Sequence, residues 1–235
     1  MDAREFESPK PLTTAVLTLA VFIAVLYLVS IGLDIYFSML VSGAIAHDAT
    51  SVPGMVAHVH DLTVMQALLQ LLALVLFVTD TILFCMWIYR TASNNLALGA
   101  QGQEFTPGWA VGYMFIPVAN LFMTYRSVLE VWSTSHDPSG QAAAPRPLPV
   151  LWWWITYLFS GLILYIASQV AGEPPRTFPD ILHGNIMDIV GLAIRLVAAV
   201  LFMVIVWKVS RLQSMHGQRQ AGELPARDMS SEVAV

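Results

Sequence analysis

The chain has 235 residues, of which 57% are apolar and only 11% are charged, and its formal net charge is −5. Soluble domains carry roughly a quarter charged residues, so this composition excludes an ordinary soluble fold. The Lys and Arg residues form no basic stripe that could hold phosphates, which argues against a nucleic-acid partner. Cys85 is the only cysteine, so the chain cannot form an internal disulfide.

Four apolar runs are long enough to cross a bilayer, because a helix needs about 20 apolar residues to span the hydrocarbon core. They cover approximately residues 12–46, 64–90, 150–171 and 182–207. The first run is longer than the apolar stretch of a cleavable signal, so we expect it to be a retained span. The second run is expected to continue as a helix to Gly99, a residue type that commonly ends helices. The predicted fold class is therefore an all-α integral membrane helical bundle.

A further segment, residues 108–132, is apolar but interrupted by Gly112 and Pro117, and it leaves two topologies open. If this segment does not cross the membrane, nine of the eleven Lys and Arg residues fall on one side. Because Lys and Arg favour the cytoplasmic side, the charge pattern favours four spans with both termini in the cytoplasm. The segment would then form a re-entrant or interfacial helical hairpin between the second and third spans. Five spans remain the alternative.

The domain organisation follows from the same pattern. Residues 1–211 are predicted to form a single helical membrane domain. Residues 212–235 are more polar and are predicted to be a disordered cytoplasmic tail.

Residues 87–132 carry the most distinctive sequence pattern. The chain reads WIYR from residue 87, NNLALG from residue 94 and PGWAVGYMFIPVANL from residue 107. This region resembles the domain-of-unknown-function 4328 family of bacterial membrane proteins. The positions that carry the resemblance are Trp87, Arg90, Asn95, Leu98, Gly99, Pro107, Trp109, Gly112, Phe115, Pro117, Asn120, Leu121 and Trp132. The chain departs from the family at Thr124, near which the family often has a proline. The resemblance implies a bacterial inner-membrane protein and transfers no activity.

Polar residues of this region form a candidate binding cluster, which consists of Arg90, Asn95, Asn120, Arg126 and Glu130. Arg126 and Glu130 are four residues apart, so on a helix they share a face and can pair. Arg90 ends the second apolar run at the predicted cytoplasmic boundary of the membrane, where the hairpin would also lie. The cluster could bind an anionic headgroup or a small anion. The alternative is a structural role, in which the arginines extend to the interface and a local salt bridge holds the hairpin.

Four ionisable residues lie inside the predicted spans: Asp34, Asp80, Asp188 and Arg195. Charges at such positions are costly, and they indicate either a transport pathway or a buried pair. Asp34 and Arg195 are expected at similar depth, and Asp188 lies nearly on the same helical face as Arg195. We therefore predict an Asp34–Arg195–Asp188 network. Asp80 has no obvious partner, and either structural pairing or a proton-linked role is open to it.

The sequence predicts no catalytic residue, no cofactor and no metal site. His47, His58 and His60, with Asp48 and Asp61, occupy one linker, and His183 begins the last span, but this spacing is not specific for a metal. We expect a non-enzymatic membrane scaffold or partner-binding protein. The alternatives are a small channel or permease that uses the intramembrane charges, and a membrane enzyme that acts on lipid. The expected partners are the lipid bilayer and another membrane protein or a second copy of the chain.

Overall fold

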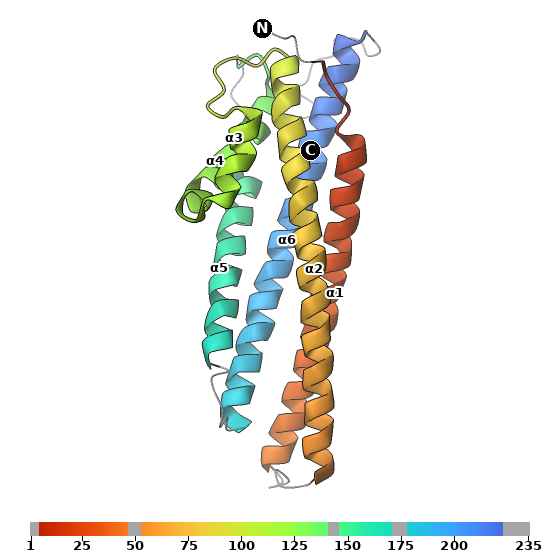
Figure 1. Ribbon diagram of the computed structural model, residues 1–235, viewed down its shortest axis with the longest axis vertical. Coiled ribbons are helices and arrows are strands. Elements are labelled where there is room, and N and C mark those ends of the chain that lie inside the picture. Colours follow the sequence, from red (N-terminus) through yellow and green to blue (C-terminus); the bar gives the residue numbers. More distant parts are fainter. Residues whose placement is uncertain (1–4, 47–52, 141–145, 171–177, 223–235) are drawn as a thin grey trace. The chain divides into compact units, whose positions relative to one another are not determined.

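The computed structural model describes residues 5–46, 53–140, 146–170 and 178–222, and the regular structure in these ranges is entirely helical (Figure 1). In chain order the elements are α1 (Lys10–Ala46), α2 (Pro53–Ala97), α3 (Pro107–Gly112), the 3-10 helix η2 (Tyr113–Phe115), α4 (Pro117–His136), α5 (Leu148–Val170) and α6 (Phe178–Gln220). The predicted all-α class is confirmed.

Four helices are long and apolar enough to cross a membrane. Among the described residues these candidate spans are Lys10–Gly43, His60–Ala97, Leu148–Gln169 and Leu182–Gln220. Many of their large apolar side chains are exposed, for example Met39 at 68% and Leu68 at 63%. Only lipid or another protein could cover that much apolar surface. The chain is therefore a membrane protein, and its four candidate spans correspond to the four apolar runs of the sequence.

Two helices extend beyond the limits expected from the sequence. α2 begins at Pro53, before the apolar run that the sequence predicts from about residue 64. Proline is favoured at the first position of a helix because its φ angle is preset and its missing N–H is not needed there. α6 continues to Gln220, past the predicted domain boundary at residue 211, because its buried face continues through Leu212 and Gln213. Residues 223–235 of the predicted tail lie outside the described ranges.

The predicted end of α2 at Gly99 is confirmed, and its geometry explains the choice of residue. Gly99 has a φ of 90°, a backbone conformation that side chains with a Cβ rarely adopt. Its N–H donates to the carbonyl of Leu96 at 3.1 Å, and the N–H of Ala100 donates to the carbonyl of Asn95 at 3.0 Å. These two bonds form a Schellman motif, which satisfies the last carbonyl groups of α2.

The α3–η2–α4 segment forms the predicted helical hairpin, in which α3 and α4 contact each other (Figure 1). The hydroxyl of Thr106 accepts from the N–H of Trp109 at 3.4 Å, and Pro107 opens α3. Ile116 is extended, with φ −99° and ψ 111°, and Pro117 opens α4. A residue that precedes proline is restricted to this region, so the Ile116–Pro117 pair separates the two helices. The hairpin is not among the candidate spans.

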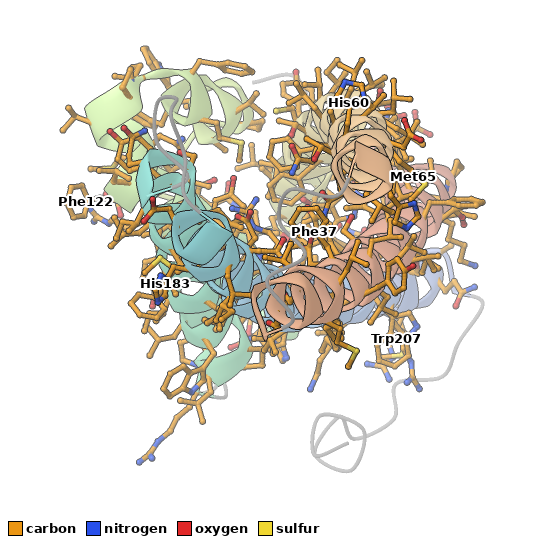
Figure 2. The ribbon with its side chains drawn as sticks, turned by 90° about the horizontal axis from the view of Figure 1, so that it is seen from below. Phe37, His60, Met65, Phe122, His183 and Trp207 are labelled. Atoms are coloured by element: carbon orange, nitrogen blue, oxygen red, sulfur yellow. The ribbon has the colours of Figure 1, made fainter. Side chains whose placement is uncertain are left out.

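The chain divides into two compact units, and the four long helices contribute to both. Unit 1 contains Met1–Thr18, Asp80–Trp152 and Leu201–Val235; unit 2 contains Leu19–Thr79 and Trp153–Val200. In unit 2, Phe37 is buried and belongs to an apolar cluster (Figure 2). In unit 1, by contrast, Phe122 and Trp207 point outward and are 62% and 50% exposed.

Candidate functional site

A buried layer of polar side chains in unit 1 is centred on Gln213 of α6, which is 0% exposed. Its Nε2 lies within hydrogen-bond distance of three acceptors, namely the Thr91 carbonyl at 2.9 Å, Asn95 Oδ1 at 2.8 Å and Ser135 Oγ at 3.1 Å. Its Oε1 accepts from Asn94 Nδ2 at 3.2 Å. One amide therefore connects α6 to α2 and to α4.

The segment that precedes α1 is bound to the same layer through Asn94. Asn94 Oδ1 accepts from the N–H of Glu7 at 3.1 Å, and its Nδ2 donates to the Glu7 carbonyl at 2.8 Å. The Glu7 carboxylate forms an ion pair with Arg90. Arg90, which lies within α2, thus pairs with a residue far away in the sequence, a contact that no local pattern indicates.

Trp87 is fully buried and joins three helices. Its Nε1 donates to Ser210 Oγ of α6 at 2.8 Å. Ser210 also accepts from the hydroxyl of Thr13 of α1 at 2.6 Å. The indole ring stacks on Phe84 with 5.7 Å between the ring centroids. The first residue of the family-like motif therefore has a packing role.

Three charged residues fix the loop that precedes α3, and we call Glu104, Arg126 and Glu130 the loop anchor. The Glu130 carboxylate accepts from the backbone N–H groups of Glu104 at 2.5 Å and of Phe105 at 3.1 Å. Arg126 forms an ion pair with the Glu104 carboxylate at 2.6 Å. Burial raises the pKa of Glu130, and the two backbone N–H groups oppose that shift. Arg126 and Glu130, which the sequence places on one helix face, meet through Glu104.

Thr124 stands where the related family often has a proline, and α4 passes through it as an unbroken helix. Its hydroxyl donates to Asn120 Oδ1 at 2.6 Å. Because threonine keeps its backbone N–H, the helix needs no bend at this position.

Within the described residues, the five predicted cluster residues therefore do not share one set of partners. Arg90 pairs with Glu7, and Asn95 belongs to the Gln213 layer, whereas Asn120 accepts from a neighbour on its own helix. Arg126 and Glu130 share the loop anchor. This distribution favours the structural role for the arginines, and a use of these residues as an anion site stays a prediction.

Several buried nitrogen atoms of unit 1 have no hydrogen-bond partner in the part of the chain that the structure describes. They are Asn95 Nδ2, Trp132 Nε1, His136 Nε2, His216 Nε2 and Arg219 Nε. The Nδ1 of His136 lies 2.7 Å from the Trp132 carbonyl and must carry the proton, since a carbonyl only accepts. Burial lowers the pKa of His136, and the nearby Lys208 adds to this effect. The ring is therefore neutral near pH 7.

In unit 2, Asp34 of α1 forms hydrogen bonds with residues of α2 and α6. Its Oδ1 accepts from Gln66 Nε2 of α2 at 2.5 Å. The Asn185 amide of α6 donates to the Asp34 carbonyl at 2.6 Å and to Ser38 Oγ at 2.7 Å. Asp188 lies close enough to interact electrostatically with Asp34. The sequence does not predict the roles of Gln66 and Asn185, because isolated amides inside apolar runs carry no distinctive spacing.

Arg195 is directed to α5. Its Nε donates to Ser160 Oγ at 2.9 Å, and its guanidinium lies over the Tyr157 ring, 5.1 Å from the centroid. The described contacts include no ion pair between Arg195 and Asp34 or Asp188, so the structure brings together only the two carboxylates of the predicted network. Asp80, in unit 1, has an Oδ1 atom that is buried without a hydrogen-bond partner.

The histidines considered for a metal are dispersed. Among the described residues no group of three His, Cys, Asp or Glu side chains could hold a metal ion. His58 contacts the Tyr36 hydroxyl at 3.3 Å, and the exposed His60 lies 3.7 Å from Asp61. His47 and Asp48 lie outside the described ranges.

Comparison with known proteins gives one match. A family model described as a domain of unknown function, DUF4328, matches residues 52–211, which is 160 of the 235 residues. The match includes α2, α3, η2, α4 and α5 entirely, with most of α6. No curated protein and no solved structure matches the chain.

Proposed function

The chain belongs to the DUF4328 family, and from that premise we propose that it is a non-enzymatic membrane scaffold that binds another membrane protein or a second copy of itself. The proposal places it in a bacterial inner membrane with both termini in the cytoplasm. The concentration of Lys and Arg on one side of the four apolar runs supports this orientation.

The observation that carries the proposal is the anchored loop of residues 100–106. Gln101, Gly102 and Glu104 are exposed, yet the loop is fixed by two backbone hydrogen bonds to Glu130 and by the Arg126–Glu104 ion pair. Loops that a rigid framework positions are frequent recognition elements. A loop that is both exposed and fixed loses little conformational freedom when a partner binds it.

The buried layer supports the same function. The side chains of Asn94, Asn95 and Gln213 are buried, and each makes at least one hydrogen bond to another helix. Buried networks of this kind specify one arrangement of the helices around them. The most polar part of the family-like region therefore contributes rigidity, which a scaffold requires.

Photocrosslinking in living cells tests the proposal. A photoreactive amino acid at Gln101 should give one discrete protein adduct, which mass spectrometry identifies as one membrane protein or as a second copy of the chain. Glu130→Ala removes the acceptor for both loop N–H groups, so the adduct should decrease at least five-fold, while a photoreactive residue at the exposed Ser139 serves as the control. No adduct at Gln101, or an unchanged yield in Glu130→Ala, would contradict the proposal.

A small channel or permease is the second candidate, and Asp80 is the observation that favours it. Its carboxylate lies within a candidate span and has one buried oxygen without a partner. An intramembrane carboxylate in that condition is a candidate for a proton or cation pathway. Ion flux into liposomes that contain the purified protein, abolished by Asp80→Asn, would support this candidate. Flux that equals that of empty liposomes would exclude it for the ions tested.

A further inference from the structure

We propose that the tip of the α3–η2–α4 hairpin inserts into the acyl-chain region of one leaflet and returns to the side it came from. The surface in question comprises five large apolar residues that are exposed in the structure: Trp109 at 55%, Phe115 at 70%, Ile116 at 44%, Val118 at 73% and Phe122 at 62%. The partner it fits is lipid.

The depth of the tip follows from one contact inside unit 1. Met114 of η2 lies against Cys85 of α2, with 3.9 Å between the two sulfur atoms. Cys85 is within the second candidate span, His60–Ala97. From Arg90 to Cys85 is five residues, which at about 1.5 Å per residue places the tip roughly 7.5 Å beyond the Arg90 position along α2.

The other end of the hairpin lies at the polar end of the same helix. Ser135, near the end of α4, donates to Asn95 Oδ1 at 3.4 Å. From Asn95 to Cys85 is ten residues, so the hairpin covers about 15 Å of α2, half of a hydrocarbon core of about 30 Å. A segment of that reach enters one leaflet and does not cross both.

Along the hairpin the side chains change from charged to aromatic to apolar, which is the order expected from the surface of a leaflet toward its acyl chains. The charged loop anchor stands at the base. Trp109, three residues into α3 and 5.1 Å from the Tyr113 ring, supplies the aromatic group that favours the interface. Phe115, Val118 and Phe122 follow at the tip, and residues 107–125 contain no charged side chain. Figure 2 shows Phe122 directed away from the helices.

Irregular backbone at membrane depth must have its polar groups satisfied. The hairpin meets this condition at its break, since the N–H of Ile116 donates to the Tyr113 carbonyl at 3.3 Å and the N–H of Asn120 donates to the Ile116 carbonyl at 2.7 Å. Pro117 has no N–H to satisfy. The tip therefore presents mainly apolar side chains to its surroundings.

Depth-dependent fluorescence quenching tests this inference. In a Cys85→Ser background whose thermal midpoint matches the natural protein, single cysteines Val118→Cys, Ile82→Cys and Ser139→Cys are labelled with an environment-sensitive fluorophore. The full chain is reconstituted in vesicles of three parts phosphatidylcholine to one part phosphatidylglycerol. Quenching is measured with lipids that carry a nitroxide on the headgroup or on carbon 5 of the acyl chain, and with aqueous iodide.

The label at Val118 should be quenched at least two-fold more by the acyl-chain nitroxide than by iodide, as should the label at Ile82, which is exposed on the α2 span. The label at Ser139, between α4 and α5, should respond to iodide instead. Iodide quenching at Val118 equal to that at Ser139 would place the tip in water and overturn the inference. Protection of Val118 from both quenchers would overturn it too, because protein would then cover the tip.

Discussion

Replacement of Gln213 by leucine should remove the central connection of the buried polar layer. The wild-type amide has two N–H donors and one acceptor oxygen, so it can satisfy three hydrogen bonds at once among the four contacts it makes with α2 and α4. At about 0.5–1.5 kcal/mol for each bond, Gln213→Leu should lower the free energy of unfolding by about 2–4 kcal/mol. The loss stays within this range because Asn95 and Asn94 keep other partners, Ser135 and Glu7.

Reversible unfolding in mixed micelles, titrated with sodium dodecyl sulfate and followed by tryptophan fluorescence, measures this change. Gln220→Leu is the matched control, since Gln220 lies on the same helix, is exposed, and makes a single contact of 3.4 Å with the Ala97 carbonyl. It should change the free energy of unfolding by less than about 0.5 kcal/mol. Equal effects of the two substitutions would refute the reasoning, because burial and hydrogen bonding at residue 213 would then have no energetic consequence.

Three further predictions use the same assay. Trp87→Phe and Trp132→Phe both shrink a buried ring, but only Trp87→Phe removes a hydrogen bond, to the α6 serine, so it should cost about 1 kcal/mol more than Trp132→Phe, which removes a buried N–H without a partner; the reverse order would contradict the hydrogen-bond assignment. The pKa of His136 is lowered by burial, so the folded state favours the neutral ring, and its contribution to stability is present above the ordinary value of 6.5 and is lost as the pH falls through the folded-state pKa. His136→Gln should flatten the decline in stability below pH 6.5, and an unchanged decline would assign it to other groups. A Cβ at Gly191 would lie 2.7 Å from a leucine of α5, so Gly191→Ala should cost about 1–3 kcal/mol. A Cβ at Gly32 meets nothing within 4 Å, so Gly32→Ala should stabilise the protein by up to about 1 kcal/mol; similar values for both would show that the close approach at Gly191 is not required.

The segments that form helices could be predicted because the length of an apolar run and the backbone preferences of Gly and Pro act locally. The four apolar runs predict the four long helices, and Gly99 predicts the end of α2. Pro117 predicts the break inside the hairpin, where Ile116 is extended and α4 begins. Each of these features depends on a few neighbouring residues, so the sequence is enough to identify it.

The partners of the polar residues could not be predicted in the same way. Arg126 lies four residues before Glu130, but the structure satisfies both through Glu104, because backbone N–H groups of a loop offer the carboxylate two aligned donors. Arg195 finds its partners on α5. These pairings depend on how distant helices are rotated toward each other, which residue spacing within one helix does not determine.

The burial of Gln213 has a signal in the sequence that lies outside its immediate neighbours. Gln213 lies in a stretch that looks polar, beyond the predicted domain boundary, and nothing in its immediate surroundings distinguishes it from an exposed glutamine. However, Val206, Val209, Ser210, Gln213 and Gly217 recur at helical spacing, and all five are buried. A small or apolar face that continues past the end of the membrane span indicates that the helix and its packing continue as well.

The four-span arrangement, with the hairpin returning to its own side, is tested most directly by thiol accessibility in intact cells. In the Cys85→Ser background, a membrane-impermeant maleimide is applied to Ser139→Cys, which follows the hairpin, and to His60→Cys, at the opposite end of α2. We expect His60→Cys to be labelled in intact cells, whereas Ser139→Cys should be labelled only after the membrane is permeabilised. Labelling of Ser139→Cys in intact cells would contradict the four-span arrangement, because residues 108–132 would then cross the membrane as a fifth span.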